Sequence, residues 1–205
     1  VTLNAGTGAI TQDGDGAADV IAEVLLADAT TGIDLDTTVV SVDATVSGTG
    51  NIALDETNAI TLTNVDTVNG SITITAGGAV VATDVESTSD LDANDISITG
   101  VGIQAGLITA GAGANADVTL NAGTGAITDN EVGTADVIAD ALTADADDGI
   151  DLDTTVVSVD ASVTADGVIT LDETDAITLT NVDTVNGSIT ITAGGAVVAT
   201  DVEST

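Results

Sequence analysis

The only side chains in this sequence that could act as acids or bases near neutral pH are carboxylates. The 205 residues include 34 Asp and Glu but no Lys, Arg, His, Cys or Tyr. Without His, Cys, Lys or Tyr the chain lacks the usual general bases and nucleophiles, and without Arg it lacks a cation to stabilise an oxyanion. We therefore expect that the protein is not an enzyme.

Two neighbouring carboxyl pairs, Asp55-Glu56 and Asp172-Glu173, come closest to a catalytic arrangement. Glycoside hydrolysis uses two carboxyl groups that are about 5–9.5 Å apart. A solvated acidic corner between strands is the simpler interpretation of both pairs. We adopt that interpretation.

Binding of divalent cations is the chemistry that the carboxylates favour most. Ca²⁺ prefers several carboxylate and carbonyl oxygens at flexible corners. Stacking of two successive corners in the second half of the chain predicts one local cluster, formed by Asp145, Asp147, Asp148, Asp172, Glu173 and Asp175. Ca²⁺ is therefore the one candidate cofactor, and the alternative is a diffuse acidic surface that keeps the protein soluble.

A second acidic segment, residues 12–16 (Gln-Asp-Gly-Asp-Gly), has a slight likeness to a calcium loop. It lacks the spaced acids and the terminal Glu of an EF-hand. Its counterpart, residues 129–133, loses the Asp-Gly-Asp pattern. The segment therefore adds little to the calcium hypothesis.

An internal repeat determines where these acids lie. Residues 1–88 align with residues 118–205 at a constant offset of 117, without a gap, and 71 of the 88 positions are identical. Self-similarity of this kind is the signature of a repeat architecture. The chain therefore divides into one complete unit, residues 1–117, and a second, incomplete copy, residues 118–205, that continues the first.

Shorter strand-like segments recur inside the unit, five times in 117 residues at intervals of 20 to 28 residues. Val1-Thr2-Leu3 and Ile72-Thr73-Ile74 are examples, and their apolar–polar–apolar alternation is typical of half-buried strands. Gly, Asn and Asp separate them from further short strands, as corners require. Three strands and three corners per rung predict an all-β fold, a parallel β-helix (β-solenoid) with five rungs per repeat.

Several of these rungs resemble the repeats of filamentous-haemagglutinin-like exoproteins. The resemblance is carried by residues 70–78 (Gly-Ser-Ile-Thr-Ile-Thr-Ala-Gly-Gly), 51–56 (Asn-Ile-Ala-Leu-Asp-Glu) and 118–123 (Val-Thr-Leu-Asn-Ala-Gly). It covers essentially the whole chain, although the absence of Lys, Arg and aromatic residues is a departure from that family. The resemblance implies a right-handed β-helix, secretion by a bacterium, and a role as an adhesin or surface structure.

The charge excludes some partners and favours others. A chain without Lys or Arg cannot neutralise phosphates, so we expect neither nucleic-acid binding nor docking on anionic membranes. The longest apolar runs are far too short for direct membrane insertion. With about 8.8 rungs the rod would be roughly 42 Å long and carry about one negative charge per 1.2 Å, denser than duplex DNA at about 1.7 Å.

These observations predict a structural or adhesive component of a long bacterial fibre, extracellular or on the cell surface, for example in a biofilm matrix. The expected partners are other copies of the chain, end to end or side by side, and divalent cations. The alternative is a cation-dependent glycan-binding or ice-binding solenoid. Outward Thr residues such as Thr2, Thr73, Thr119 and Thr190 suggest the ice-binding form.

Overall fold

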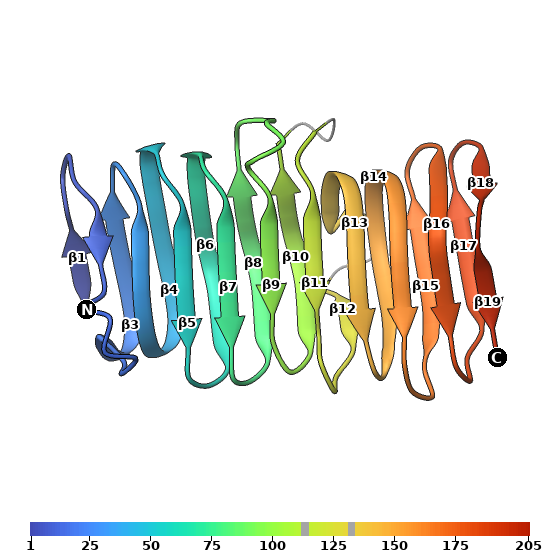
Figure 1. Ribbon diagram of the computed structural model, residues 1–205, viewed down its shortest axis with the longest axis horizontal. Coiled ribbons are helices and arrows are strands. Elements are labelled where there is room, and N and C mark those ends of the chain that lie inside the picture. Colours follow the sequence, from blue (N-terminus) through green and yellow to red (C-terminus); the bar gives the residue numbers. More distant parts are fainter. Residues whose placement is uncertain (112–114, 131–133) are drawn as a thin grey trace.

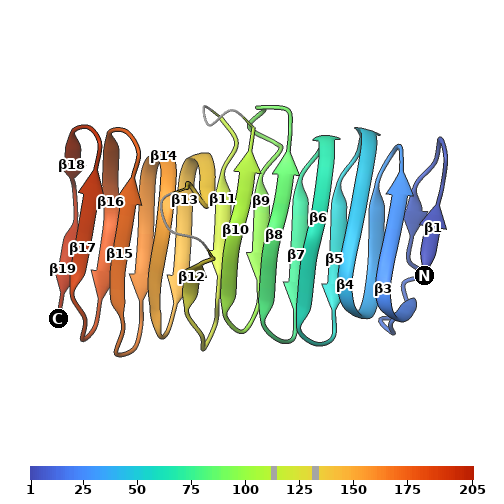
Figure 2. The same ribbon diagram turned by 180° about the vertical axis from the view of Figure 1, so that it is seen from behind.

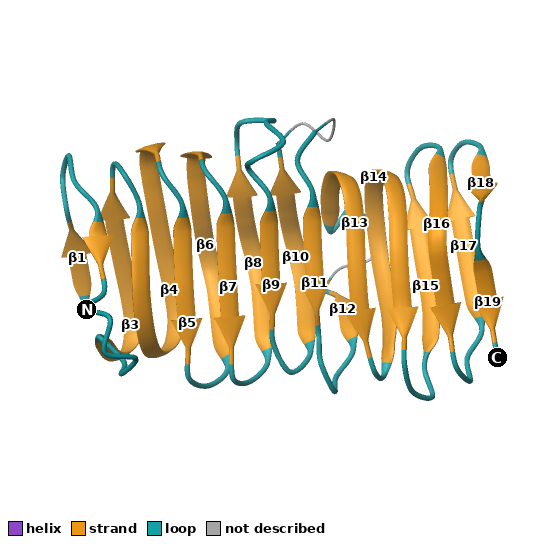
Figure 3. Ribbon diagram, viewed as in Figure 1, coloured by secondary structure: helices purple, strands orange, loops and turns teal. Residues whose placement is uncertain are grey.

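The computed structural model describes residues 1–111, 115–130 and 134–205. All regular structure in these ranges is β-strand, in 19 strands joined in one hydrogen-bonded sheet (Figure 3). Every pairing between these strands is parallel. The all-β solenoid predicted from the sequence is therefore confirmed. Over the same ranges, no helix has the length and apolar character needed to cross a membrane.

The sheet coils into a flattened tube with two facing walls (Figures 1 and 2). Wall A contains β2 (Ile10–Thr11), the starts of β3 (Val20–Ala29) and β4 (Ile33–Thr49), β5 (Ile52–Glu56), β7 (Ile72–Ala76), β9 (Ile96–Thr99), β11 (Val118–Asn121), the ends of β13 (Val137–Ala146) and β14 (Gly149–Val163), β16 (Ile177–Thr184), β18 (Val197–Ala199) and β19 (Val202–Ser204). Wall B contains β1 (Thr2–Asn4), the ends of β3 and β4, β6 (Ile60–Asn69), β8 (Val80–Ser87), β10 (Ile103–Ala110), β12 (Ile127–Asp129), the starts of β13 and β14, β15 (Val168–Glu173) and β17 (Ile189–Ala193).

The coil is right-handed and has about 10 turns. In Figure 1 the chain runs down the near wall and up the far wall while it advances from the N-terminus at the left to the right. At a strand spacing of about 4.8 Å the rod is roughly 48 Å long. Its 34 acids then give about one negative charge per 1.4 Å, still denser than the roughly 1.7 Å of duplex DNA.

Equivalent strands of the two units lie on opposite walls. β1 belongs to wall B, where Thr2 pairs with Leu26, whereas its copy β11 belongs to wall A, where Val118 pairs with Ile96 and Leu142. From β1 to β10, within the described residues, the chain runs along a wall eleven times and alternates between wall B and wall A. Each passage along one wall is half a turn. One unit therefore makes five and a half turns, and the expected five are wrong by half a turn.

The expected three short strands per rung are also wrong for the internal turns, because a turn such as residues 52–69 has two strands, β5 and β6, one on each wall. With three strands per rung, residues 33–35 would follow residues 24–26 within the same rung. In the structure Ile33 pairs directly with Ile10 and with Ile52, so it begins a new turn in the same column. β3, β4, β13 and β14 continue around an edge of the tube without a break, at positions such as Glu23 and Val40 that carry no turn residue.

The core fills the space between the walls with columns of aliphatic side chains. Ile33, Ile52, Ile72, Ile96 and Val118 stack in one column and are all buried. The buried cluster continues without interruption from Val20 to Val182. Because each turn covers the apolar face of the next, the stack is stable although no single turn would fold alone.

Candidate functional site: two acidic clefts on opposite walls

Aspartates of three successive turns stack in one column at the same position of each unit. In the first unit Asp36 pairs in register with Asp55, and Asp19 lies in the turn before. The Asp19 N–H donates to the Asp36 carbonyl (2.7 Å), and the Asp36 N–H donates to Asp19 Oδ2 (3.0 Å). We call Asp19, Asp36 and Asp55 the first acid ladder.

The second unit repeats this arrangement with Asp136, Asp153 and Asp172, the second acid ladder. The Asp136 N–H donates to the Asp153 carbonyl (2.7 Å), the Asp153 N–H donates to Asp136 Oδ2 (2.9 Å), and Asp153 pairs with Asp172. Strand pairing spaces the backbones of a ladder by about 4.8 Å. Like charges directly opposite each other on neighbouring strands are destabilising.

The pKa of Asp36 shows this electrostatic strain. Loss of hydration raises its pKa above the ordinary value, and the carboxylates of Asp55 and Asp19 raise it further. The chain contains no Lys, Arg or His that could offset these charges. The first acid ladder is therefore a strongly negative region of the surface.

A cleft lies beside each acid ladder. The first has a volume of about 350 Å³ and is lined by Gly16, Ala18, Asp36, Asp55, Glu56, Thr57 and Thr75. The second has a volume of about 210 Å³ and is lined by Thr134, Ala135, Asp153, Asp172, Glu173, Thr174 and Thr192. Six lining positions correspond at the offset of 117. Because the units differ by half a turn, the first cleft opens on wall A and the second on wall B.

Glu56 and Glu173 are buried in the interior beside the clefts, each 4% exposed. The Thr37 hydroxyl and the Val39 N–H donate to Glu56 Oε2, both at 2.8 Å, and the Asn58 N–H donates to Oε1 at 3.0 Å. β5 ends at Glu56, so no backbone carbonyl of that strand reaches the Val39 N–H. The Glu56 carboxylate accepts this hydrogen bond in its place.

The second unit keeps the same network. Glu173 accepts from the Thr154 hydroxyl (2.8 Å) and from the N–H groups of Val156 and Asp175 (both 3.0 Å). Neighbouring residues of a strand face opposite sides, so Glu173 faces inward whereas the exposed Asp172 faces outward. Each Asp-Glu pair is therefore divided between interior and surface, in place of the simple solvated corner that we expected.

The loop of residues 12–17 uses its carboxylates to hold its own backbone. Asp13 Oδ1 accepts from the Asp15 N–H (3.1 Å), and Asp15 Oδ1 accepts from the Ala17 N–H (2.8 Å). Gly14 and Gly16 have positive φ angles of 80° and 74°, which glycine adopts readily. Of the counterpart segment 129–133, residues 131–133 lie outside the described residues.

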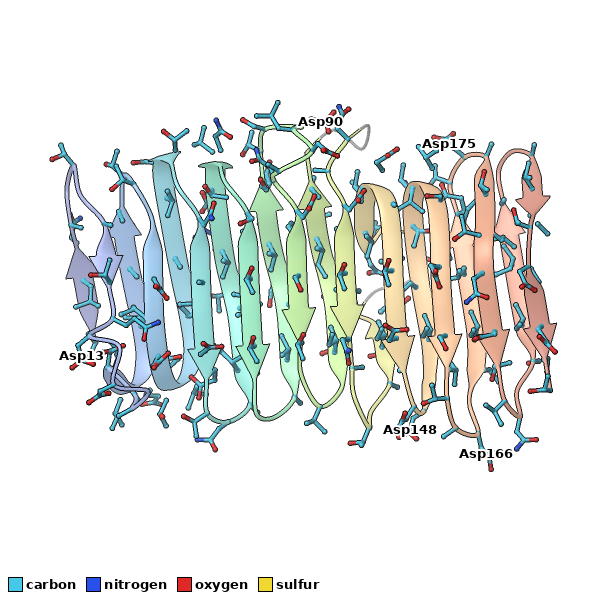
Figure 4. All side chains as sticks on the ribbon, viewed as in Figure 1. Asp13, Asp90, Asp148, Asp166 and Asp175 are labelled. Carbon is cyan, nitrogen blue, oxygen red and sulfur yellow. The ribbon has the colours of Figure 1, made fainter. Side chains whose placement is uncertain are left out.

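The six acids that the sequence analysis grouped as a cation cluster lie on different parts of the tube. Figure 4 places Asp148 at the lower edge and Asp175 at the upper edge. Asp147 precedes Asp148 in the chain and accepts a hydrogen bond from the Thr164 hydroxyl. Glu173 is buried in wall B, whereas its neighbour Asp172 is exposed on the outside of that wall.

Asp145 lies on wall A between Asn121 and Ser162 of the adjacent turns, and burial, followed by Asp160 and Asp183, raises its pKa. The expected stacking is therefore wrong, because corners that follow each other in sequence lie on opposite edges of a two-walled coil. Side chains stack only after a full turn. Within the described part of the chain, no three acidic side chains are placed to hold a metal ion.

Asp136 does not stand out among the 34 acids of the sequence, but its side chain does so in the structure. It is 1% exposed, and its Oδ1 is buried without a hydrogen-bond partner. Burial is the main cause that raises its pKa to about 7. The hydrogen bond from the Asp153 N–H lowers the pKa, and the negative charges of Asp129, Asp153 and Asp151 raise it further. It directly precedes β13, which begins at Val137.

Comparison of the chain with protein-family models, with curated proteins and with solved structures finds no match in any of the three. Function is therefore inferred from the geometry and charge described above.

Proposed function

We propose that this chain is a structural segment of a long bacterial fibre, outside the cell or on its surface, to which the solenoid contributes length, stiffness and negative charge. The observation that carries the proposal is the join between the two units. There, Val118 pairs with Ile96 and Leu120 pairs with Ile98, in the same parallel register that joins turns inside a unit. Further units would extend the rod without a hinge.

Stiffness follows from the way the turns cover one another. The buried cluster runs through both units, and every internal turn is hydrogen-bonded on both sides. Bending such a rod would open strand pairing on one side of the tube and compress close-packed side chains on the other. A fibre built in this way would resist bending over many units.

We expect the partners of the rod to be other copies of the chain and divalent cations. Each chain carries 34 acids and no Lys, Arg or His, so two rods that approach side by side repel each other. The acid ladders occur on both walls and therefore present negative charge to neighbours on two sides. Ca²⁺ prefers several carboxylate oxygens, and oxygens from two rods would supply them.

Electron microscopy of the purified chain and of material from its natural source tests this proposal. We expect rods one solenoid wide, long in the native material, and lateral bundles when Ca²⁺ is added. NaCl at equal ionic strength should leave the rods separate. Compact particles in the native material would contradict the fibre, and equal bundling in both salts would contradict bridging by divalent cations.

One outward column favours ice binding as a second candidate function. Thr73, Ser97, Thr119 and Thr143 stack on wall A in successive turns, which gives a row of hydroxyls at the strand spacing. The neighbouring column begins with Thr75 and Thr99 and then changes to Asn121 and Asp145. Measurement of thermal hysteresis tests this function, and a value of zero at millimolar protein would exclude it.

A further inference from the structure

The carboxyl group of Asp136 is buried in a site that disfavours its ionised form. Its Oδ2 accepts the Asp153 N–H at 2.9 Å, but its Oδ1 has no hydrogen-bond partner, and the residue is 1% exposed. Burial of an ionised carboxylate is costly unless the group is paired and hydrogen-bonded. The chain has no Lys, Arg or His to pair with it.

All the described titratable groups that face Asp136 are acids. β12 contributes Asp129, and β14 contributes Asp151 and Asp153. On the other side, β10 contributes the Ile108 N–H, which donates to the Asp136 carbonyl at 2.7 Å. Ionisation of Asp136 would therefore add a buried negative charge to a region that is already negative.

The first unit contains a natural control for this site. Asp19 is the equivalent residue and makes the same two backbone hydrogen bonds with Asp36. Asp19 is nevertheless exposed, so water can hydrate its charge. The two sites share their local backbone geometry and differ in the burial of the carboxyl group.

We propose that Asp136 is a proton-operated latch, which holds the adjoining turns of the second unit together while its carboxyl group is protonated and loosens them when it ionises. The latch is independent of the proposed fibre function, because it concerns local opening within a single chain.

The direction of the pH response follows from the two states of the group. In the closed structure burial raises the pKa of Asp136 to about 7, whereas after local opening the hydrated carboxyl returns toward the ordinary 3.8. Between these values the closed form keeps its proton and the open form releases it. Rising pH therefore favours opening, by up to about tenfold per pH unit, and this effect ends above the raised pKa.

Hydrogen exchange followed by NMR tests the latch at single amides. The Asp136 and Asp153 amides report on the latch, and the equivalent Asp19 and Asp36 amides report on the control. Measurements run from pH 5 to pH 8 in EDTA, on the wild type and on D136N and D19N. After correction for intrinsic exchange, we expect protection of Asp136 and Asp153 in the wild type to fall by up to about 100-fold between pH 5 and pH 7.

D136N should remove this pH dependence, and D19N should leave it unchanged. The latch is refuted if D136N keeps the wild-type dependence or if the Asp19 and Asp36 amides show the same fall. A second measurement does not depend on the folding of any variant. The ¹³C shift of the Asp136 carboxyl carbon in the wild type should titrate with a midpoint near 7, and a midpoint below 5 would overturn the proposal.

Discussion

At the scale of single residues, the buried carboxyl groups differ in the number of hydrogen bonds that they accept. Glu56 and Glu173 each receive three hydrogen bonds from the chain around them, whereas Asp136 receives one on Oδ2 and none on Oδ1. The first two residues are integral to the fold, and the third is sensitive to its own charge. This difference predicts different results when each residue is replaced.

Glu56→Ala should destabilise the protein by about 2–3 kcal/mol, because the Val39 N–H and the Thr37 hydroxyl would remain buried without an acceptor. Glu173→Ala should cost about the same, since its network is the same. Urea denaturation followed by circular dichroism measures both. Glu23→Ala is the control, because Glu23 is exposed, and it should change stability by less than about 0.5 kcal/mol. Equal effects for Glu56 and Glu23 would refute the structural role of the buried carboxylate.

At the scale of elements, glycine sets the spacing of some corners. Gly50 and Gly70 stack in successive turns, and so do Gly167 and Gly187. A Cβ on Gly70 would overlap the carbonyl oxygen of Gly50, and one on Gly187 would overlap that of Gly167. Hydroxyls hold these carbonyls from inside: Thr67 donates to Gly50 and Ser87 donates to Gly70, both at 2.8 Å.

Gly70→Ala should therefore push two turns apart and destabilise the rod by about 1–3 kcal/mol. Gly8→Ala is the matched control, because a Cβ at Gly8 would meet its nearest atom, the Ala5 carbonyl oxygen, at an ordinary 3.5 Å. Thermal unfolding of the two variants compares the positions directly. A Gly70→Ala variant as stable as Gly8→Ala would show that the turns can separate at no cost.

The sequence could predict the elements but not the way they close into turns. Alternation such as Ile72-Thr73-Ile74 predicts a strand, and the offset of 117 predicts a stack. The number of strands per turn was wrong because β4 bends around an edge at Val40, where a β-branched residue gives no turn signal. Pairing of Ile33 with both Ile10 and Ile52 is long-range information, and it appears only in the folded chain.

The same limit explains the result for the candidate site. The sequence identified Asp172 and Glu173 as notable residues, and the structure places both at the lining of a cleft. It could not predict that Asp153 and Asp136 stack with Asp172, because this requires the correct turn length. An error of half a turn moves a residue to the opposite wall, so Asp148 and Asp175 were grouped although they lie on opposite edges.

At the scale of the whole molecule, the acids act together. Burial is the largest cause of a raised pKa at six aspartates, and neighbouring acids add to it, at Asp36, Asp84, Asp117, Asp129, Asp136 and Asp145. A pKa that is higher in the folded state than in the unfolded state gives stability that is lost as pH rises. The rod should therefore be more stable in mild acid than at neutral pH.

We expect the melting temperature to rise by about 5 °C or more between pH 7.5 and pH 5 at low salt, which corresponds to roughly 1–2 kcal/mol for a chain of this size. High salt should reduce the difference, because it screens the repulsion between exposed carboxylates. Differential scanning calorimetry at both pH values, with and without 0.5 M NaCl, measures both effects. A melting temperature that is unchanged or higher at pH 7.5 would contradict the electrostatic interpretation.

The half turn in each unit predicts a visible pattern along a longer rod. Asn58 and Asp175 are equivalent residues, but residues 57–59 lead from wall A to wall B and residues 174–176 lead from wall B to wall A. They therefore lie on opposite edges. In a chain extended by one more unit, the third equivalent residue returns to the edge of Asn58.

Because the chain contains no Cys, a Cys substitution at each equivalent position allows gold labelling at known sites. Electron microscopy should show labels that alternate between the two edges, with labels on one edge repeating at about 53 Å, the length of eleven turns. Labels at Asp148 and Asp166 are the control, since both residues lie on the lower edge in Figure 4. Labels from all units on one edge, repeating at about 24 Å, would mean five whole turns per unit and would refute the half turn. The alternation would also place successive acid ladders on opposite walls, so that each rod in a fibre could meet cation-bridged neighbours on both sides.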